Sequence, residues 1–159
     1  MLPFGDIDIS GLIDIPLHAA PDLRERWGDD IEVARAASDA GLRAILLKSH
    51  IAQTADRAAI AEKVVGGIKV FGGLVLNKPV GGFNLDAVDV AIALGAKQIW
   101  MPTMDAANQY RDDGKVGGLT IFTDDGKILP AVYEIIDMVR AADIILGTGH
   151  LNVEEIRAL

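Results

Sequence analysis

All three histidines of the chain lie where an apolar, strand-like run ends. His18 follows GLIDIPL, His50 follows RAILLKS and His150 follows DIILGTG. In a parallel α/β protein the carboxyl ends of the strands form one rim, and ligands bind at that rim. Neutral imidazole is a common ligand of transition metals, so the pattern predicts that the three histidines meet at a metal site. The alternative for each is a histidine that bonds to backbone groups at a strand end or turn.

Lys48 ends the second apolar run, and strand alternation places its side chain on the same face as that of His50. Burying an ammonium group is costly unless the group is paired or its pKa falls. Lys48 therefore predicts an anionic partner, an acid–base role or carbamylation that bridges metal ions. The alternative is a salt bridge to an aspartate at the rim. By the same alternation, Asp14 shares a face with His18.

Three further polar residues near strand ends are candidates for substrate binding. Arg24 lies in the loop after His18 and suits an anionic substrate, although a solvated loop explains it equally well. Asn77 and Thr103 follow the third and fourth apolar runs. Near His150, Gly147 and Gly149 would let the backbone approach a ligand closely. The GxGxxG, GxxxxGKS and GxSxG patterns are absent, so these motifs support neither nucleotide binding nor a serine hydrolase.

The elements that position these residues alternate between strand and helix five times, which predicts a parallel sheet, either open or closed into a barrel. The expected strands are 11–17, 43–48, 69–76, 97–101 and 143–146. The expected helices are 55–65, 85–94 and 131–141, with others that begin near residues 29 and 152. Thr54 and Asn84 are expected to cap two of these helices. The polar, Gly-rich segment 104–127 predicts a loop insertion on the rim.

Composition bounds the class of protein. The 159 residues are 50% hydrophobic and 24% charged, which predicts one globular domain over 1–159 with a substantial core. The net charge of −8 argues against nucleic-acid binding. There are no cysteines, which excludes disulfides and thiolate zinc sites. Neither a long apolar run nor a signal-peptide pattern occurs, so no membrane association and a cytoplasmic location are expected.

Several runs of the sequence, in order along nearly the whole chain, resemble a family of uncharacterised proteins grouped with metal-dependent hydrolases. The family belongs to the amidohydrolase-like and PHP-like (β/α) barrels. The resemblance is carried by HAAPDL at 18–23, AGLRAILLKSHIAQTADRA at 40–58, FGGLVLNKPVGGFN at 71–84, LGAKQIWMPTMDAAN at 94–108 and TGHLNVEEI at 148–156.

The resemblance implies a distorted (β/α) barrel with divalent metal at the rim. In such proteins the first strand ends in a His-x-His pair, but here Pro16 occupies the place of the first histidine, with His18 as the second. Gln109 occupies a place where the resemblance suggests a histidine. A complete barrel usually needs about 200–250 residues, so five strands predict a partial or distorted TIM-like barrel. The chain would then be truncated, or a half-barrel that a second copy completes as a homo-oligomer.

Together these observations predict a metal-dependent hydrolase of a small-molecule substrate. The metal ligands would be His18, His50 and His150, with Lys48 and His50 as catalytic residues. A zinc, manganese or iron ion would lower the pKa of a bound water to about 7. One alternative is an inactive, truncated homologue that binds a small anionic ligand or a partner chain. Another is a metal-free lyase or aldolase that uses Lys48 as a Schiff base.

Overall fold

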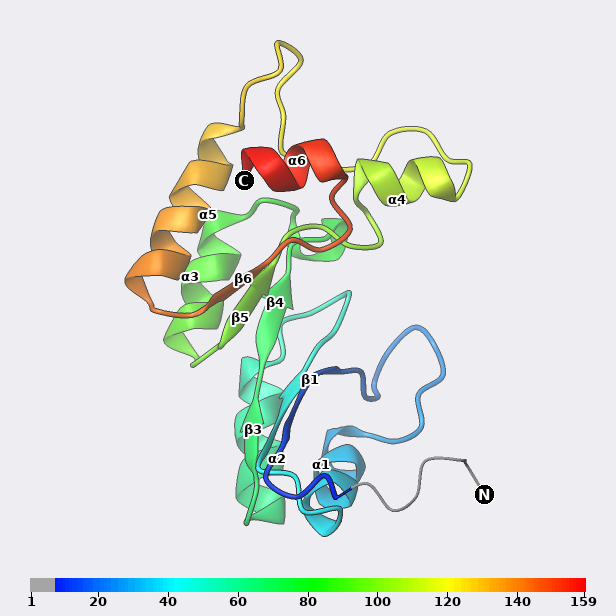
Figure 1. Ribbon diagram of the computed structural model, residues 1–159, viewed down its shortest axis with the longest axis vertical. Helices are drawn as coiled ribbons and strands as arrows, with labels where there is room; N and C mark the ends of the chain where they lie inside the picture. Colours follow the sequence, from blue (N-terminus) through cyan, green and yellow to red (C-terminus); the bar gives the residue numbers. More distant parts are fainter. Residues whose placement is uncertain (1–7) are drawn as a thin grey trace.

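The computed structural model describes residues 8–159, and its strands form two three-stranded parallel sheets (Figure 1). The first sheet has the order β1 (Ile13–Leu17), β2 (Ala44–Leu47) and β3 (Lys69–Phe71). The second has the order β4 (Gly73–Val75), β5 (Gln98–Trp100) and β6 (Ile145–Gly147). The predicted strand positions and the parallel α/β class are confirmed. The described residues form no closed barrel, so the predicted partial or distorted TIM-like barrel is not confirmed.

The third predicted strand is divided between the two sheets at Gly72. Its first part, β3, pairs with β2, and its second part, β4, pairs with β5. A Cβ atom on Gly72 would lie 2.3 Å from the Thr54 carbonyl oxygen, so only glycine fits at the division. The Thr54 hydroxyl donates to the Leu47 carbonyl at 2.8 Å and accepts from the Gly73 N–H at 2.9 Å. Thr54 therefore precedes a helix as predicted, but its side chain holds the divided strand and makes no cap bond.

Helices cover one face of each sheet (Figure 1). Helices α1 (Asp30–Asp39) and α2 (Ala55–Val65) pack on each other, and their alanines meet Ile45, Leu47 and Val70 of the first sheet. Helices α3 (Leu85–Ala93) and α5 (Pro130–Ala141) also pack on each other, and they cover the second sheet. α1 begins at a capping box between Asp29 and Glu32, and Asn84 caps α3 as predicted. Each sheet thus has its own hydrophobic core.

The opposite face carries a smaller cluster that joins the sheets. Leu46 of β2, Val75 of β4 and Trp100 of β5 are buried together there. At the outer edge of the first sheet this cover is incomplete, because Leu12, Ile13 and Ile15 are 55%, 52% and 47% exposed.

The remaining elements surround the carboxyl ends of the strands. They are η1 (Lys78–Val80), α4 (Ala107–Asp112) and α6 (Val153–Ala158). The predicted loop insertion 104–127 contains α4 and is tied back on itself by the bridge between Ala106 and Leu119. No helix among residues 8–159 is long and apolar enough to cross a membrane.

The buried carboxylate of Glu155 fastens this segment to α6. Its Oε1 accepts from the Thr120 hydroxyl at 2.7 Å and from the Ile121 N–H at 3.2 Å. Its Oε2 accepts from the Asn152 N–H at 3.0 Å, which completes the capping box of α6. One side chain therefore positions both the segment and the helix that follows His150.

Candidate active site

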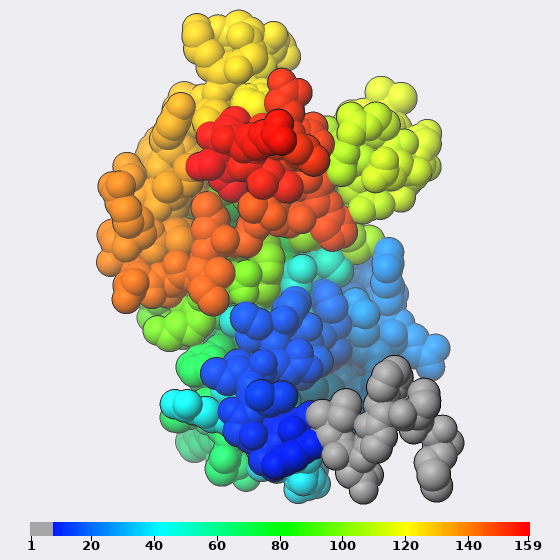
Figure 2. Space-filling model, in the orientation of Figure 1, coloured from blue at the N-terminus to red at the C-terminus, as the bar shows by residue number. Residues whose placement is uncertain are grey.

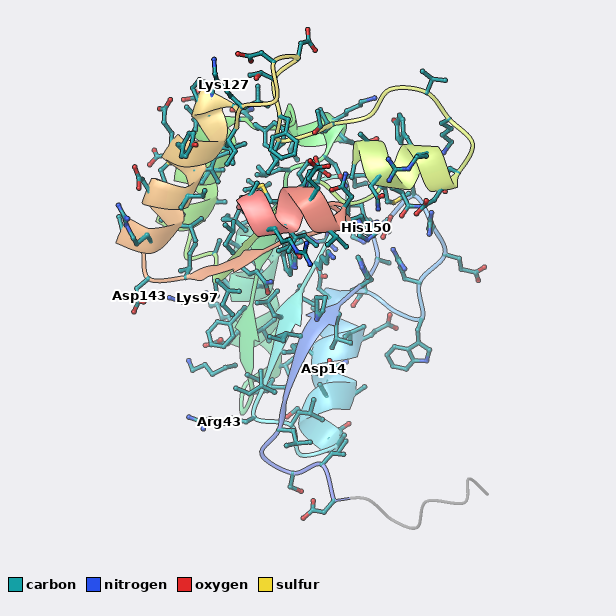
Figure 3. All side chains as sticks on the ribbon, turned by 45° about the horizontal axis from the view of Figure 1, so that its top comes forward. Asp14, Arg43, Lys97, Lys127, Asp143 and His150 are labelled. Carbon is teal, nitrogen blue, oxygen red and sulfur yellow. The ribbon has the colours of Figure 1, made fainter. Side chains whose placement is uncertain are left out.

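A cavity of ≈ 390 Å³ lies at the carboxyl ends of the strands. His18, Lys48 and His50 reach it from the ends of β1 and β2, and His150 reaches it from the turn after β6. In Figure 3 His150 lies beside α4, and Arg43 and Lys97 lie on the other side of the molecule in this view. The space-filling view shows that α4 and the segment after β1 lie on the same side of the molecule (Figure 2). The other lining residues are Arg24, Met104, Asp105, Gln109, Tyr110, Asp113 and Lys115.

The rings of His18 and His50 stack on each other at one side of this cavity. Their centroids are 4.6 Å apart and the ring planes differ by 28°. His18 Nδ1 is buried and has no hydrogen-bond partner among the described residues. Burial and the charges of Arg26 and Lys48 lower the pKa of His18. The ring is therefore held in its neutral form near pH 7.

Asp14 does not join His18 in the cavity. The register of β1 against β2 shifts between Asp14 and Leu17, and Pro16 lies within this irregular stretch. Because the shift breaks the alternation of side chains, residues 14 and 18 need not share a face. Asp14 is exposed on β1 (Figure 3).

A buried hydrogen-bond network holds the His50 ring from behind. Its Nδ1 lies 2.9 Å from Thr103 Oγ1. Asn77 Nδ2 donates to the same oxygen at 2.9 Å and to the His50 carbonyl at 3.1 Å. Asn77 Oδ1 accepts from the N–H groups of Thr103 at 2.8 Å and Asp105 at 3.3 Å. Asn77 and Thr103 are 1% and 0% exposed, so the network is shielded from water.

His50 is the most strongly perturbed of the three histidines. Burial, the adjacent His18 imidazole and the charge of Lys48 lower the pKa of His50 to about 4. Burial and the charge of Lys48 also lower the pKa of His150. Both imidazoles are consequently neutral near pH 7.

His150 is held by a second chain of polar side chains. Its Nδ1 lies 2.8 Å from Gln109 Oε1, and Gln109 Nε2 donates to the Asp113 carboxylate at 2.9 Å. Asp113 in turn pairs with Lys115 at 2.9 Å. The backbone N–H of His150 donates to the Pro102 carbonyl at 2.9 Å. The ring is thus fixed both by its own backbone and by α4.

Lys48 has no ion-pair partner among the described residues. Its ammonium lies 4.9 Å from the centroid of the Trp100 ring, a cation–π distance. Burial lowers the pKa of Lys48. The alternative to a functional role was a salt bridge from Lys48 to an aspartate at the rim, and no such salt bridge is present among residues 8–159. Lys48 therefore offers a positive charge to whatever enters the cavity.

The three predicted substrate-binding residues occupy different environments. The exposed Arg24 lines the cavity, whereas Arg26 is paired with Asp22 at 2.6 Å. Asn77 lines a smaller neighbouring cavity of ≈ 170 Å³ that also borders His50. Thr103 is fully buried and touches His50. The side-chain hydrogen bonds of Asn77 and Thr103 thus hold His50 in position. Direct contact of either residue with a substrate stays a prediction.

The glycines near His150 serve packing against the protein itself. A Cβ on Gly147 would lie 2.4 Å from Trp100 Cδ1, and a Cβ on Gly149 would lie 2.3 Å from the Met101 carbonyl oxygen. Gly149 also has φ +61°, which favours glycine. Both glycines are thus required by close packing within the protein, and an approach of their backbone to a ligand stays a prediction.

The fit of this site to a metal ion is incomplete. His18 and His50 lie side by side, as two ligands would. Among the described residues, however, no group of three or more His, Cys, Asp or Glu side chains could hold a metal ion. The metal site inferred from the resemblance stays a prediction.

Sequence reasoning placed segment 104–127 on the rim, but it did not predict α4 or the side chains that this segment contributes to the cavity. Gln109, Tyr110, Asp113 and Lys115 all line the cavity. The segment is polar and Gly-rich, so its composition predicts a loop and gives no sign of the short helix α4. The spacing of Gln109 and Asp113 was a usable signal, because residues four apart lie on the same face of a helix.

Comparison with known proteins gives a family but no activity. No curated protein and no solved structure matches the chain. Residues 11–159 match the model of a family of unknown function, DUF6282, and these residues include every side chain of the cavity. The chain therefore belongs to the DUF6282 family.

Proposed function

We propose that the protein is a hydrolase that acts on a small anionic molecule in the cavity at the carboxyl ends of the strands. The observation that carries the proposal is the half-buried Lys48, which lines the cavity without an ion-pair partner among the described residues. A half-buried ammonium group without a carboxylate favours an anionic ligand. Arg24 and Lys115 line the same cavity.

The neutral imidazoles support catalysis in addition to binding. A neutral imidazole can take up a proton through one nitrogen and donate a hydrogen bond through the other. Three such rings line the same cavity. Hydrolysis needs a group that deprotonates water and a group that stabilises the developing negative charge.

The test is binding followed by turnover. Inorganic phosphate and small carboxylates are titrated into the protein by calorimetry, and the Lys48→Met variant should bind the best ligand about ten- to a hundredfold more weakly. Lys97→Met is the matched control, because it removes the same charge from a residue that does not line the cavity and lies across the molecule from His150 (Figure 3). Equal affinity of the wild type and Lys48→Met would contradict the proposal.

Turnover is then measured on a panel of esters, amides and phosphate esters that carry a second anionic group. Hydrolysis that depends on Lys48 supports the proposal. Lys48-dependent binding without turnover of any member would favour the alternative of a protein that only binds a small anionic ligand.

The lowered pKa of Lys48 also favours the Schiff-base alternative, because a less protonated amine is a better nucleophile. Borohydride reduction in the presence of small aldehydes and ketones separates the two. A covalent adduct at Lys48 would favour the lyase or aldolase over the hydrolase.

A further inference from the structure

The two hydrogen-bonded histidines of the cavity are held by partners of opposite kinds. Thr103 Oγ1 faces His50 Nδ1, and Gln109 Oε1 faces His150 Nδ1. A hydroxyl can donate or accept a hydrogen bond, whereas an amide oxygen can only accept one. The partners therefore decide which ring nitrogen carries the proton in each neutral imidazole.

For His50 the decision follows from the hydroxyl of Thr103. The oxygen already accepts a hydrogen bond from Asn77 Nδ2, and the residue is 0% exposed. Within the described residues, His50 Nδ1 is the sole acceptor within hydrogen-bond distance of the Thr103 hydroxyl. A buried hydroxyl that fails to donate is costly, so Thr103 donates to Nδ1. The proton of the neutral His50 ring then resides on Nε2.

The orientation of the Asn77 amide supports this assignment. Its nitrogen donates to the His50 carbonyl, and its oxygen accepts from the N–H groups of Thr103 and Asp105. In the reversed orientation the amide nitrogen would face these two N–H groups, and the amide oxygen would face the His50 carbonyl. The amide nitrogen therefore faces Thr103, and every polar atom of the network has a partner.

For His150 the orientation of the Gln109 amide determines which ring nitrogen carries the proton. Gln109 Nε2 donates to the carboxylate of Asp113, which pairs with Lys115 and can only accept. The amide oxygen must then face His150, where it accepts from Nδ1–H at 2.8 Å. In this ring the proton is on Nδ1, and Nε2 keeps a lone pair.

We propose that His150 and His50 are an acid–base pair of opposite tautomers, in which His150 Nε2 accepts a proton and His50 Nε2–H donates to the reacting oxygen. The proposal rests on the proposed hydrolase function and names its substrate class as an ester or amide that carries an anionic group. Thr103 and Gln109 are positioning residues, because they act through the histidines. Neither nitrogen of His50 has a free lone pair for a metal ion.

The reaction balances with these two groups. His150 Nε2 takes a proton from a water molecule as the water oxygen bonds to the carbonyl carbon. The π electrons of the carbonyl move onto its oxygen, which accepts a hydrogen bond from His50 Nε2–H. When the carbonyl re-forms, the bond to the leaving group breaks and the leaving group takes the proton from His150. The products are an acid and an alcohol or amine, and both rings return to their starting state.

The test reads the tautomers directly and needs no turnover. Long-range proton–nitrogen NMR of the full chain with ¹⁵N-labelled histidine, at pH 8, distinguishes Nδ1–H from Nε2–H rings. The signals are assigned with the His50→Gln and His150→Gln variants. We expect His50 as Nε2–H and His150 as Nδ1–H. The same tautomer at both positions, or the reverse assignment, would overturn the proposal.

Two Thr103 variants test how the His50 tautomer is set. Thr103→Val removes the donor, and the Nε2–H signal of His50 should give way to Nδ1–H or to a mixture of the two. Thr103→Ser should restore the wild-type spectrum. An unchanged His50 tautomer in a folded Thr103→Val protein would count against the proposal. Opposite tautomers in a protein that hydrolyses nothing would overturn the hydrolase function while leaving the hydrogen-bond assignment intact.

Discussion

At the scale of single residues, His50 links the electrostatics of the cavity to the stability of the protein. Its pKa is about 4 in the folded protein and near 6.5 in an unfolded chain. Between these values the unfolded chain binds more protons than the folded one, so stability rises with pH across this window. The contribution of His50 is complete above pH 6.5 and is lost as the pH falls towards 4.

We therefore expect the free energy of unfolding to fall between pH 6.5 and 4.5 more steeply in the wild type than in His50→Asn. Urea denaturation at a series of pH values measures this difference. Carboxylates also titrate at acid pH, but they are the same in both proteins and cancel in the comparison. Parallel curves would show that His50 is not held neutral by its surroundings.

The residues of the site were predictable from sequence to different degrees. His18, Lys48, His50 and His150 stand out because a polar side chain that ends an apolar run is visible in one dimension. The roles of Thr103 and Gln109 were not visible, because each depends on a contact between segments distant in sequence. Thr103 and His50 are 53 positions apart.

At the scale of elements, the strands and most helices fall where hydrophobic runs and caps placed them. The division of the third strand could not be predicted in this way. It arises where Thr54, at the start of α2, approaches Gly72 too closely for any side chain. The Gly72-Gly73 pair was visible in the sequence, but the partner that requires it was not.

The anchor between α6 and the segment after α4 gives an element-scale prediction. Glu155→Gln should destabilise the protein by about 1–3 kcal/mol, because a buried carboxylate that accepts three hydrogen bonds is replaced by an amide that brings two donors. Amide hydrogen exchange should also quicken at Thr120 and Ile121. The exposed neighbour variant Glu154→Gln is the matched control and should change neither quantity. Equal stability of the two variants would contradict the anchoring role.

At the scale of the whole molecule, the first sheet has an apolar outer edge. β1 lies at the end of its sheet, and Leu12, Ile13 and Ile15 are about half exposed there. Exposed apolar edge strands tend to pair with other chains. The homo-oligomer expected from sequence is therefore proposed to form through this edge.

Light scattering with size-exclusion chromatography should give a mass above 16.9 kDa that increases with protein concentration. Ile13→Lys should shift the population towards the monomer, because a charge opposes burial of the edge. Val116→Lys is a suitable control, because Val116 is 98% exposed and lies outside β1, in the segment after α4. A concentration-independent monomer mass in the wild type would contradict the proposal.

The divided strand also has a consequence for how the molecule opens. Each sheet has its own core, so the two halves can unfold with different free energies, as separate cooperative units. Asn77 and Thr103 belong to the second half and His50 to the first, so the buried network crosses the boundary. A transient opening of either half alone would separate His50 from the hydroxyl that sets its tautomer. The proposed hydrolysis would then require both units to be closed at the same time, and on heating it would be lost before the more stable of the two cores unfolds.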